Sequence, residues 1–313
     1  MWLAIFMVFL GVVLLWGGAE AMVKGAVKLA LDLGVPSLVV GLTVVAITTS
    51  LPEAFASITA QVVGHEGNVA LGNVIGSNIA NLGLVLGIAL MICPLDIPVV
   101  IKRREMPIVV LASLLLFALM FFGAIGRWEG VLLLVGMVAY TLYQFKISEQ
   151  EKSIAKQALQ QEVVAKLTLW REILLVIVGV GLLIVGASFL IKGAIAIATH
   201  FGMSQRVIGL TIVAIGSSFP EIATVVVAAM KRRTDLILGN VFGSNIYNVT
   251  MVAGLAAVVA PIHFSPRMLA VDIPVMLAFT VAAWALVHFR KRLGRIVGIG
   301  FVLSYLFYLG YVI

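Results

Sequence analysis

Long apolar runs alternate with short polar intervals along this chain. A helix that crosses a bilayer needs about 20 mainly apolar residues. The chain divides into ten runs of that kind, and the predicted spans are residues 2–22, 36–62, 68–92, 106–124, 128–146, 171–191, 205–230, 236–260, 268–288 and 296–313. One long polar interval, residues 148–170, separates five spans from the other five. The pattern predicts an all-α polytopic membrane protein with ten transmembrane helices, in which residues 1–147 and 171–313 each form a five-helix unit.

The two halves of the chain also resemble each other in sequence. The stretch Gly34–Glu53 recurs as Gly202–Glu221, and the block Gly72–Asn81 recurs as Gly239–Asn248. Because each half has an odd number of spans, the second half enters the membrane from the side opposite to the first. The sequence therefore predicts two inverted five-helix repeats, an architecture in which transporters hold their substrate near the bilayer midplane.

Composition supports the membrane assignment and excludes several function classes. The chain is 62% hydrophobic and 11% charged, whereas soluble domains have about 45–50% apolar and 25% charged residues. Its net charge of +7 is explained by cytoplasmic anchoring, so no nucleic-acid partner is expected. Cys93 is the only cysteine, which excludes an internal disulfide and a thiolate metal site. The sequence has no H-E-x-x-H motif, and an enzyme is not expected.

The distribution of basic residues predicts the orientation, since cytoplasmic connections carry an excess of Lys and Arg. With ten spans, one side of the membrane receives only Arg127, Lys192, Arg206 and Arg267, and every other Lys and Arg falls on the opposite side. We therefore expect both termini outside the cell membrane and the 148–170 loop in the cytoplasm. Membrane lipids are the expected surroundings, and the sequence indicates no protein partner and no cofactor.

Two carboxylates lie inside apolar spans, at Glu53 and Glu221. A charge at the bilayer centre costs at least about 2.5 kcal/mol, so a functional role is the default interpretation. Pro52 and Pro220 directly precede these glutamates and are expected to kink their helices and free carbonyl oxygens beside the carboxylates. A third glutamate, Glu20, is predicted to form a local ion pair with Lys24 four residues later.

Polar side chains at helical spacing surround the two glutamates and complete a candidate cation site. The predicted ligand set is Glu53, Glu221, Thr49, Ser217, Ser50, Ser218, Asn81, Asn248, Ser77, Ser244, Asn73 and Asn240. Any one of the Ser, Thr and Asn side chains has an alternative role, which is to hydrogen-bond a neighbouring helix. All-oxygen ligands suit hard cations, above all Ca²⁺. The four histidines lie near predicted span ends, which disfavours zinc, copper and iron.

These motifs resemble the two alpha-repeats of the cation/calcium exchanger superfamily, especially its sodium/calcium exchanger branch. The resemblance rests on Thr-Ser-Leu-Pro-Glu at Thr49–Glu53, on Ser-Ser-Phe-Pro-Glu at Ser217–Glu221 and on the two Gly-Asn-Val-x-Gly-Ser-Asn-Ile-x-Asn blocks. It implies an antiporter that moves Ca²⁺ against Na⁺ or H⁺ by alternating access. It also implies that Glu53 and Glu221 bind Ca²⁺, aided by the carbonyl groups of Thr49 and Ser217.

The resemblance further implies a set of sodium-binding positions, all suitably filled in this chain: Ala46, Thr49, Ser50, Ser77, Ala214, Ser217, Ser218 and Ser244. One position departs from the pattern, because the family usually has an aspartate where this chain has Asn248, opposite Asn81. Two carboxylates favour an exchange of one Ca²⁺ for two protons, since a buried glutamate can bind a proton near neutral pH. The complete sodium set favours Na⁺ instead. A calcium-selective channel lined by the same ligands is a further alternative.

Overall fold

The computed structural model describes residues 1–64, 66–158, 169–203 and 216–312, and these are overwhelmingly helical. Its α-helices are α1 (Trp2–Leu33), α2 (Ser37–Val40), α3 (Ala46–Thr49), α4 (Leu51–Gly64), α5 (Gly67–Ala80), α6 (Leu86–Ile92), α7 (Met106–Met120), α8 (Arg127–Ala158), α9 (Leu169–His200), α12 (Phe219–Met230), α13 (Thr234–Tyr247), α14 (Ala253–Val259), α15 (Ile273–Phe289) and α16 (Arg295–Val312). Short π-helical segments join or precede several of them, at Gly41–Val45, Asn81–Val85, Ile101–Glu105, Asn248–Val252 and Met268–Asp272.

Seven helices in the described part of the chain are long and apolar enough to cross a membrane. They span Trp2–Leu33, Ser37–Val63, Gly67–Ile92, Arg127–Ile147, Trp170–His200, Thr234–Val259 and Met268–Phe289, and shorter apolar helices occupy Phe219–Met230 and Arg295–Tyr311. This organisation is that of a multi-pass membrane protein. Part of the predicted span 205–230 lies outside the described residues. The predicted loop 148–170 begins as a continuation of α8 through Ala158 and ends in the first turn of α9.

The helix formed by α13 and α14 lies at the centre of the molecule. In its most apolar window 89% of the residues are buried, against 28% for α1 and for α9. Asn240, Ser244 and Asn248 therefore project from the most enclosed helix of the bundle. The polar residues that the sequence predicts as ligands are thus kept away from lipid.

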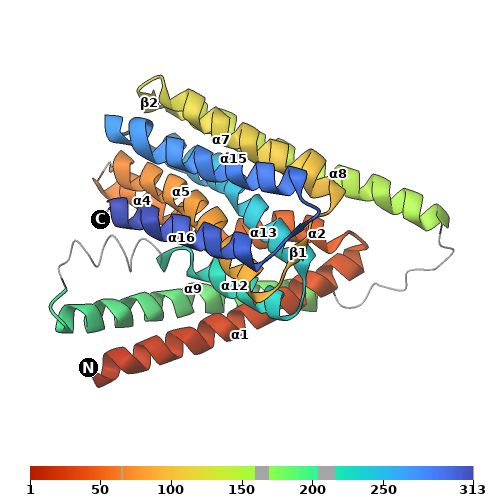
Figure 1. Ribbon diagram of the computed structural model, residues 1–313, viewed down its shortest axis with the longest axis horizontal. Coiled ribbons are helices and arrows are strands. Elements are labelled where there is room, and N and C mark those ends of the chain that lie inside the picture. Colours follow the sequence, from red (N-terminus) through yellow and green to blue (C-terminus); the bar gives the residue numbers. More distant parts are fainter. Residues whose placement is uncertain (65, 159–168, 204–215, 313) are drawn as a thin grey trace.

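The pair formed by α1 and α9 runs along one edge of the molecule, and the two helices lie side by side (Figure 1). Glycines make this contact close. A Cβ added at Gly18 would be 2.8 Å from the carbonyl oxygen of Gly179, and one added at Gly186 would be 2.8 Å from the amide nitrogen of Leu15. The backbones of α1 and α9 are therefore in direct contact, as small residues allow between membrane helices.

Two short antiparallel ladders tie the first half of the chain to the second. Leu95–Asp96 (β1) pairs with Arg292–Leu293 (β4), and Ala124–Ile125 (β2) pairs with Ile262–His263 (β3). The labelled strands β1 and β2 lie at opposite ends of the helix bundle (Figure 1). At each end of the bundle, one strand from the first half therefore pairs with one strand from the second half.

Local features recur between the halves at an almost constant offset. One π-helical segment begins at Asn81 and another at Asn248, 167 residues later; a second pair begins at Ile101 and Met268, also 167 residues apart. Short π-helical segments inside α-helices are frequent at functional sites. The first pair begins at two of the predicted ligands, Asn81 and Asn248.

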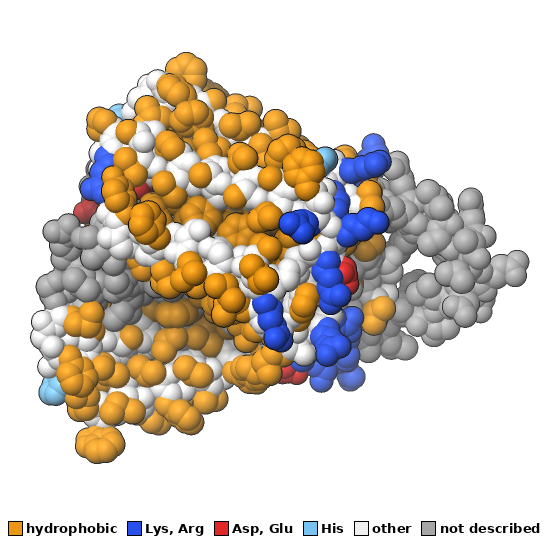
Figure 2. All heavy atoms as spheres, in the orientation of Figure 1, with side chains coloured by type: hydrophobic (Ala, Val, Ile, Leu, Met, Phe, Trp, Pro, Cys, Tyr) orange, Lys and Arg blue, Asp and Glu red, His pale blue; other side chains and the backbone are white. Residues whose placement is uncertain are grey.

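Basic side chains gather at one end of the face in Figure 2. At Lys102 and Arg290, connections from the two halves meet, since the ammonium group of Lys102 donates to the carbonyl oxygen of Arg290. The predicted pair of Glu20 with Lys24 is wrong: Glu20 instead forms its ion pair with Lys231, in the turn between α12 and α13. The sequence spacing identified the acid correctly but could not show that another helix brings a basic residue closer.

Candidate functional site

Both glutamates lie just after a break in a membrane helix, as the prolines predict. The first helix stops at Thr49, Ser50 adopts a turn with φ −81° and ψ 1°, and α4 starts at Leu51. In the second half, Ser218 has nearly the same conformation, with φ −85° and ψ 3°, and α12 starts after it. Glu53 and Glu221 each lie in the first turn of the helix that follows the break.

Glycines bring the two halves into contact at this level. The π-helical segment that starts at Gly41 packs on α13 so closely that a Cβ at Gly239 would be 2.8 Å from the Gly41 backbone. A Cβ at Gly243 would be 2.6 Å from the carbonyl oxygen of Leu42. Only glycine allows this approach of the two backbones, and it places the end of α3 against α13.

Thr49 makes the polar contact that this packing permits. Its hydroxyl Oγ1 donates to Asn240 Oδ1 at 3.0 Å, and it lies 3.3 Å from the Ser244 hydroxyl. Ser244 is also 3.4 Å from Asn240 Oδ1. Three of the predicted ligands, from both halves of the chain, therefore form one buried cluster.

Each of the two carboxylates lies near polar side chains of the other half of the chain. The Glu53 carboxylate lies near Ser77 and Ser217, and the Glu221 carboxylate lies near Thr49, without a hydrogen bond in either case. The two carboxylates also lie near each other. Both side chains are 1% exposed. That the two motif glutamates form one cation site stays a prediction.

The buried polar atoms around the glutamates lack protein partners. All four carboxylate oxygens of Glu53 and Glu221, the hydroxyls of Ser50 and Ser218 and both amide atoms of Asn81 are buried without a hydrogen bond. A buried carboxylate without a partner is costly. Bound cations or protons would satisfy these groups, because the unpartnered atoms are mostly oxygens, the ligand type of hard cations.

Asn248 is held by two asparagines that the sequence interpretation did not single out. Its Nδ2 donates to Asn78 Oδ1 at 3.0 Å, and Asn78 Nδ2 donates to the carbonyl oxygen of Asn245 at 3.2 Å. Asn248 Oδ1 has no partner and remains available as a ligand. Asn78 and Asn245 occupy matching positions of the two repeated blocks, which was the signal that could have found them.

Asn73 differs from its counterpart Asn240 in surroundings. Asn73 is half-buried, and its Nδ2 donates both to the carbonyl oxygen of Glu53 and to Ser57 Oγ, each at 2.9 Å. Asn240 is fully buried. Asn73 therefore positions the backbone at Glu53, whereas Asn240 contacts Thr49.

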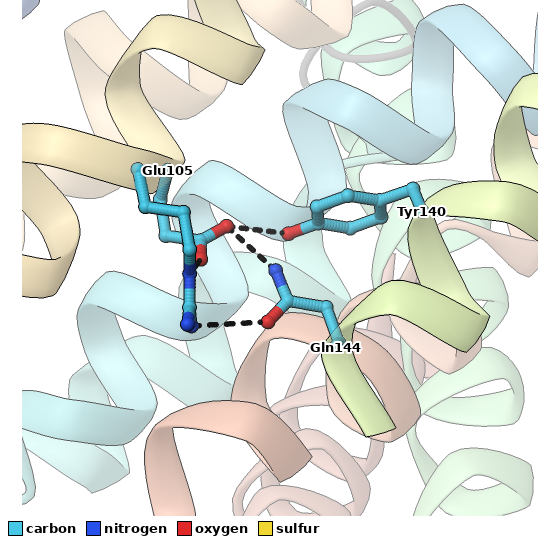
Figure 3. A network of polar contacts seen from close by, with 4 residues as sticks. Glu105, Tyr140 and Gln144 are labelled. Atoms are coloured by element: carbon cyan, nitrogen blue, oxygen red, sulfur yellow. Dashed lines mark hydrogen bonds and ion pairs between the residues drawn. The ribbon is translucent and has the colours of Figure 1, made fainter. Parts of the chain in front are cut away.

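Another buried carboxylate, Glu105, lies outside this site. The sequence places it at the end of a span, but the structure buries it completely. It accepts hydrogen bonds from Arg104, from the Tyr140 hydroxyl at 2.9 Å and from Gln144 Nε2 at 2.7 Å (Figure 3). Its oxygens are fully used by the protein, in contrast to those of Glu53 and Glu221. This network ties the π-helical segment Ile101–Glu105, just before α7, to α8 and leaves no ligand for a cation.

No three side chains of His, Cys, Asp or Glu come together in the described ranges. The candidate site consists of two carboxylates with hydroxyl and amide groups. Oxygen groups of this kind suit hard cations.

The chain is similar to known proteins over almost its whole length. A family model described as "Sodium/calcium exchanger protein" matches residues 3–146 and 171–313. The chain is 35% identical over 299 residues to the putative antiporter CaxA of Alkalimonas amylolytica, covering 95% of this chain and 92% of that protein. It is 28% identical over 336 residues to the sodium/calcium exchanger MaX1 of Methanosarcina acetivorans, covering 96% and 95% of the two chains.

A solved structure has the same fold. The sodium-calcium exchanger NCX_Mj, soaked with zero Na⁺ and Ca²⁺, matches with a TM-score of 0.86 and 27% identity, covering 99% of each chain. These similar proteins are named as transporters and not as enzymes. The chain is a multi-pass membrane antiporter of the cation/calcium exchanger superfamily, and it belongs to the sodium/calcium exchanger protein family.

Proposed function

We propose that this protein exports Ca²⁺ in exchange for H⁺ by alternating access, through one central site built from Glu53 and Glu221. The observation that carries the proposal is the pair of buried carboxylates whose four oxygens have no protein partner. Groups of this kind need a cation or a proton at every stage of a transport cycle. Hydroxyl and amide oxygens of Thr49, Ser77 and Asn248 supply further ligands.

Charge balance favours protons as the counter-ion. Two carboxylates neutralise one Ca²⁺, and two protons neutralise them equally well. Three sodium ions at the same site would leave a net positive charge in a medium that penalises it. Asn248 is central to this argument, because an aspartate there would supply a third negative charge.

Sodium is the alternative counter-ion, and two observations favour it. Relatives of this chain are named sodium/calcium exchangers, and the side chains that suit sodium are present, among them Ser50, Ser77, Ser218 and Ser244. The same central site would serve this exchange.

We infer an architecture of ten transmembrane helices in two inverted repeats. The recurrence of π-helical segments, strands and motif glutamates at offsets of 167 or 168 residues supports it. The clustering of basic side chains at one end supports a cell-membrane orientation with both termini outside and residues 148–170 in the cytoplasm. The glycine-lined pair α1 and α9 is the proposed mover, because its contact lies at the edge of the bundle.

Calcium uptake into inverted membrane vesicles tests the proposal. We expect a proton gradient to drive ⁴⁵Ca²⁺ uptake, with less uptake under a sodium gradient of equal size. Glu53→Gln and Glu221→Gln should each abolish uptake, whereas Asp96→Asn, a substitution at an exposed aspartate, should leave it unchanged. Intact uptake in both site variants would refute the central-site model.

The same vesicles distinguish exchange from a channel. An exchanger requires a counter-ion gradient, so removing both gradients should stop net Ca²⁺ movement. A Ca²⁺ current that persists without any counter-ion would support the channel alternative and contradict the antiporter.

A further inference from the structure

Glu53 continues into a row of polar side chains on one face of α4. Ser57 and Gln61 follow at i+4 and i+8 and are fully buried. At a rise of about 1.5 Å per residue the row covers about 12 Å along the helix. It runs from the site toward Gly64, where α4 ends.

This row is incompletely satisfied by the protein. Gln61 Nε2 donates to the carbonyl oxygen of Ala260 at 2.9 Å, but Gln61 Oε1 is buried with no partner. Ser57 donates to the carbonyl oxygen of Ala70 at 3.3 Å and accepts from Asn73. Each of these oxygens has room for another donor, and an orphaned buried polar atom commonly marks an internal water.

A surface opening lies beyond the end of α4, where the backbone amide of Glu66 donates to the carbonyl oxygen of Ala60 at 3.1 Å. Ala260, the partner of Gln61, lies two residues before the start of β3. There a surface cavity of about 450 Å³ is lined by polar groups that include Glu66, Asn68 and His263. Asn73, half-buried, connects the row to the backbone at Glu53, because its Nδ2 donates both to Ser57 Oγ and to the carbonyl oxygen of Glu53.

The matching helix of the other half, α12, has no such row. The residues that match Ser57 and Gln61 are Val225 and Ala229, which are apolar and buried. The two motif glutamates are therefore equivalent in the repeats, but the helix faces that extend from them are not.

We propose that Ser57, Gln61 and Asn73 form a water-binding track that connects Glu53 to the β3 end of the molecule, and that no equivalent track extends from Glu221 along α12. Water held there hydrates the carboxylate and carries protons or the hydrated cation to one side only. The inference rests on the proposed function in taking Glu53 as a site residue, but its test does not depend on transport.

Thiol accessibility measures this asymmetry directly. Cys93 is the only cysteine, so Cys93→Ser gives a background for single-cysteine variants. Gln61→Cys, Ser57→Cys, Val225→Cys and Ala229→Cys are exposed to Ag⁺ from each side of sealed vesicles, and the remaining free thiol is titrated with a maleimide after denaturation. Glu66→Cys, at the exposed mouth, reports which side of the membrane the β3 end faces.

We expect Gln61→Cys and Ser57→Cys to react from the same side as Glu66→Cys, on the order of tenfold faster than Val225→Cys and Ala229→Cys, because a thiol reacts as the hydrated thiolate. Equal rates at matching positions of the two halves, or reaction of Gln61→Cys from the opposite side, would overturn the track. Gel filtration of each variant verifies folding, and Ser57→Cys stands in if Gln61→Cys does not fold. Because labelling is scored without a gradient, failure of Ca²⁺/H⁺ exchange in vesicles leaves this result intact, and the reverse also holds.

Discussion

Thr49 of the first half donates a hydrogen bond to Asn240 of the second at 3.0 Å, with both side chains buried. This bond crosses from the end of α3 to the middle of α13, the most enclosed helix. It also fixes the Thr49 backbone, whose carbonyl group the family resemblance assigns to Ca²⁺. The site is therefore not two separate halves but a single junction.

Thr49→Ala should weaken both the junction and cation binding. The substitution leaves Asn240 Oδ1 buried with only the Ser244 contact at 3.4 Å, and an unsatisfied buried acceptor costs about 1–3 kcal/mol. We expect a lower thermal midpoint in detergent and a smaller rise of that midpoint on adding Ca²⁺.

Thr48→Ala is the matched control for this substitution. The Thr48 hydroxyl bonds only to the carbonyl oxygens of Val44 and Val45 in its own helix. Thr48→Ala should keep the rise of the thermal midpoint that Ca²⁺ causes. If Thr48→Ala and Thr49→Ala both lose this rise equally, the contact of Thr49 with Asn240 has no special role in cation binding.

Gly239→Ala should disrupt the packing that forms the junction. The added Cβ would be 2.8 Å from the backbone of Gly41, so one helix must move, at a cost of about 1–3 kcal/mol. Gly300→Ala adds the same methyl to α16, where nothing lies within 4 Å; helix propensity there favours alanine by about 1 kcal/mol. The thermal midpoint should fall in Gly239→Ala and rise in Gly300→Ala. Equal changes of the midpoint in the two variants would contradict the close backbone contact at Gly239.

The helix breaks before the two motif glutamates were predictable from the sequence because their signals are local. The duplicated motifs located Glu53 and Glu221, and Pro52 and Pro220 predicted the helix breaks. The transmembrane pattern also predicted the order of the described helices, although α1 extends to Leu33, beyond its predicted end. Apolar runs show which residues cross the membrane. They do not show how far a helix continues into the headgroup region of the bilayer.

Contacts between distant segments were beyond the sequence interpretation. Glu20 was assigned to Lys24 by helical spacing, but its partner Lys231 comes from a turn 211 residues away. Glu105 directly precedes the predicted span 106–124, and only the structure shows that Tyr140 and Gln144 of α8 hydrogen-bond to it. Spacing rules describe neighbours on one helix and contain no information on which helices pack together.

Glu105→Gln should destabilise the fold without changing the counter-ion. Glutamine places an amide donor where Arg104, Tyr140 and Gln144 all donate (Figure 3), at a cost of about 1–3 kcal/mol. The control Asp96→Asn alters an ion pair with Arg292 in which both side chains are exposed, worth about 0–1 kcal/mol. A changed ratio of proton-driven to sodium-driven uptake in Glu105→Gln would assign this network a direct role in transport.

Charge reversal should test the contact between α1 and the α12–α13 turn. Glu20→Lys and Lys231→Glu each place like charges together, and the double variant restores an ion pair. Because both side chains are partly exposed, the coupling should be about 0.2–1 kcal/mol and should decline with added salt. If the single and double variants have additive effects on thermal stability, the two residues do not interact.

Asn248→Asp should move the counter-ion preference from protons toward sodium. The aspartate adds a third carboxylate beside Glu53 and Glu221, and the resulting charge balances three sodium ions as two carboxylates cannot. The substitution also replaces the amide that donates to Asn78 Oδ1 at 3.0 Å, so loss of that bond must be separated from gain of charge. Asn248→Ala removes the bond and adds no charge. In vesicles, the ratio of sodium-driven to proton-driven Ca²⁺ uptake should rise in Asn248→Asp and stay at the parental value in Asn248→Ala. An unchanged ratio in Asn248→Asp would mean that the number of carboxylates does not select the counter-ion, and the argument for protons would then fail even if both glutamates bind Ca²⁺.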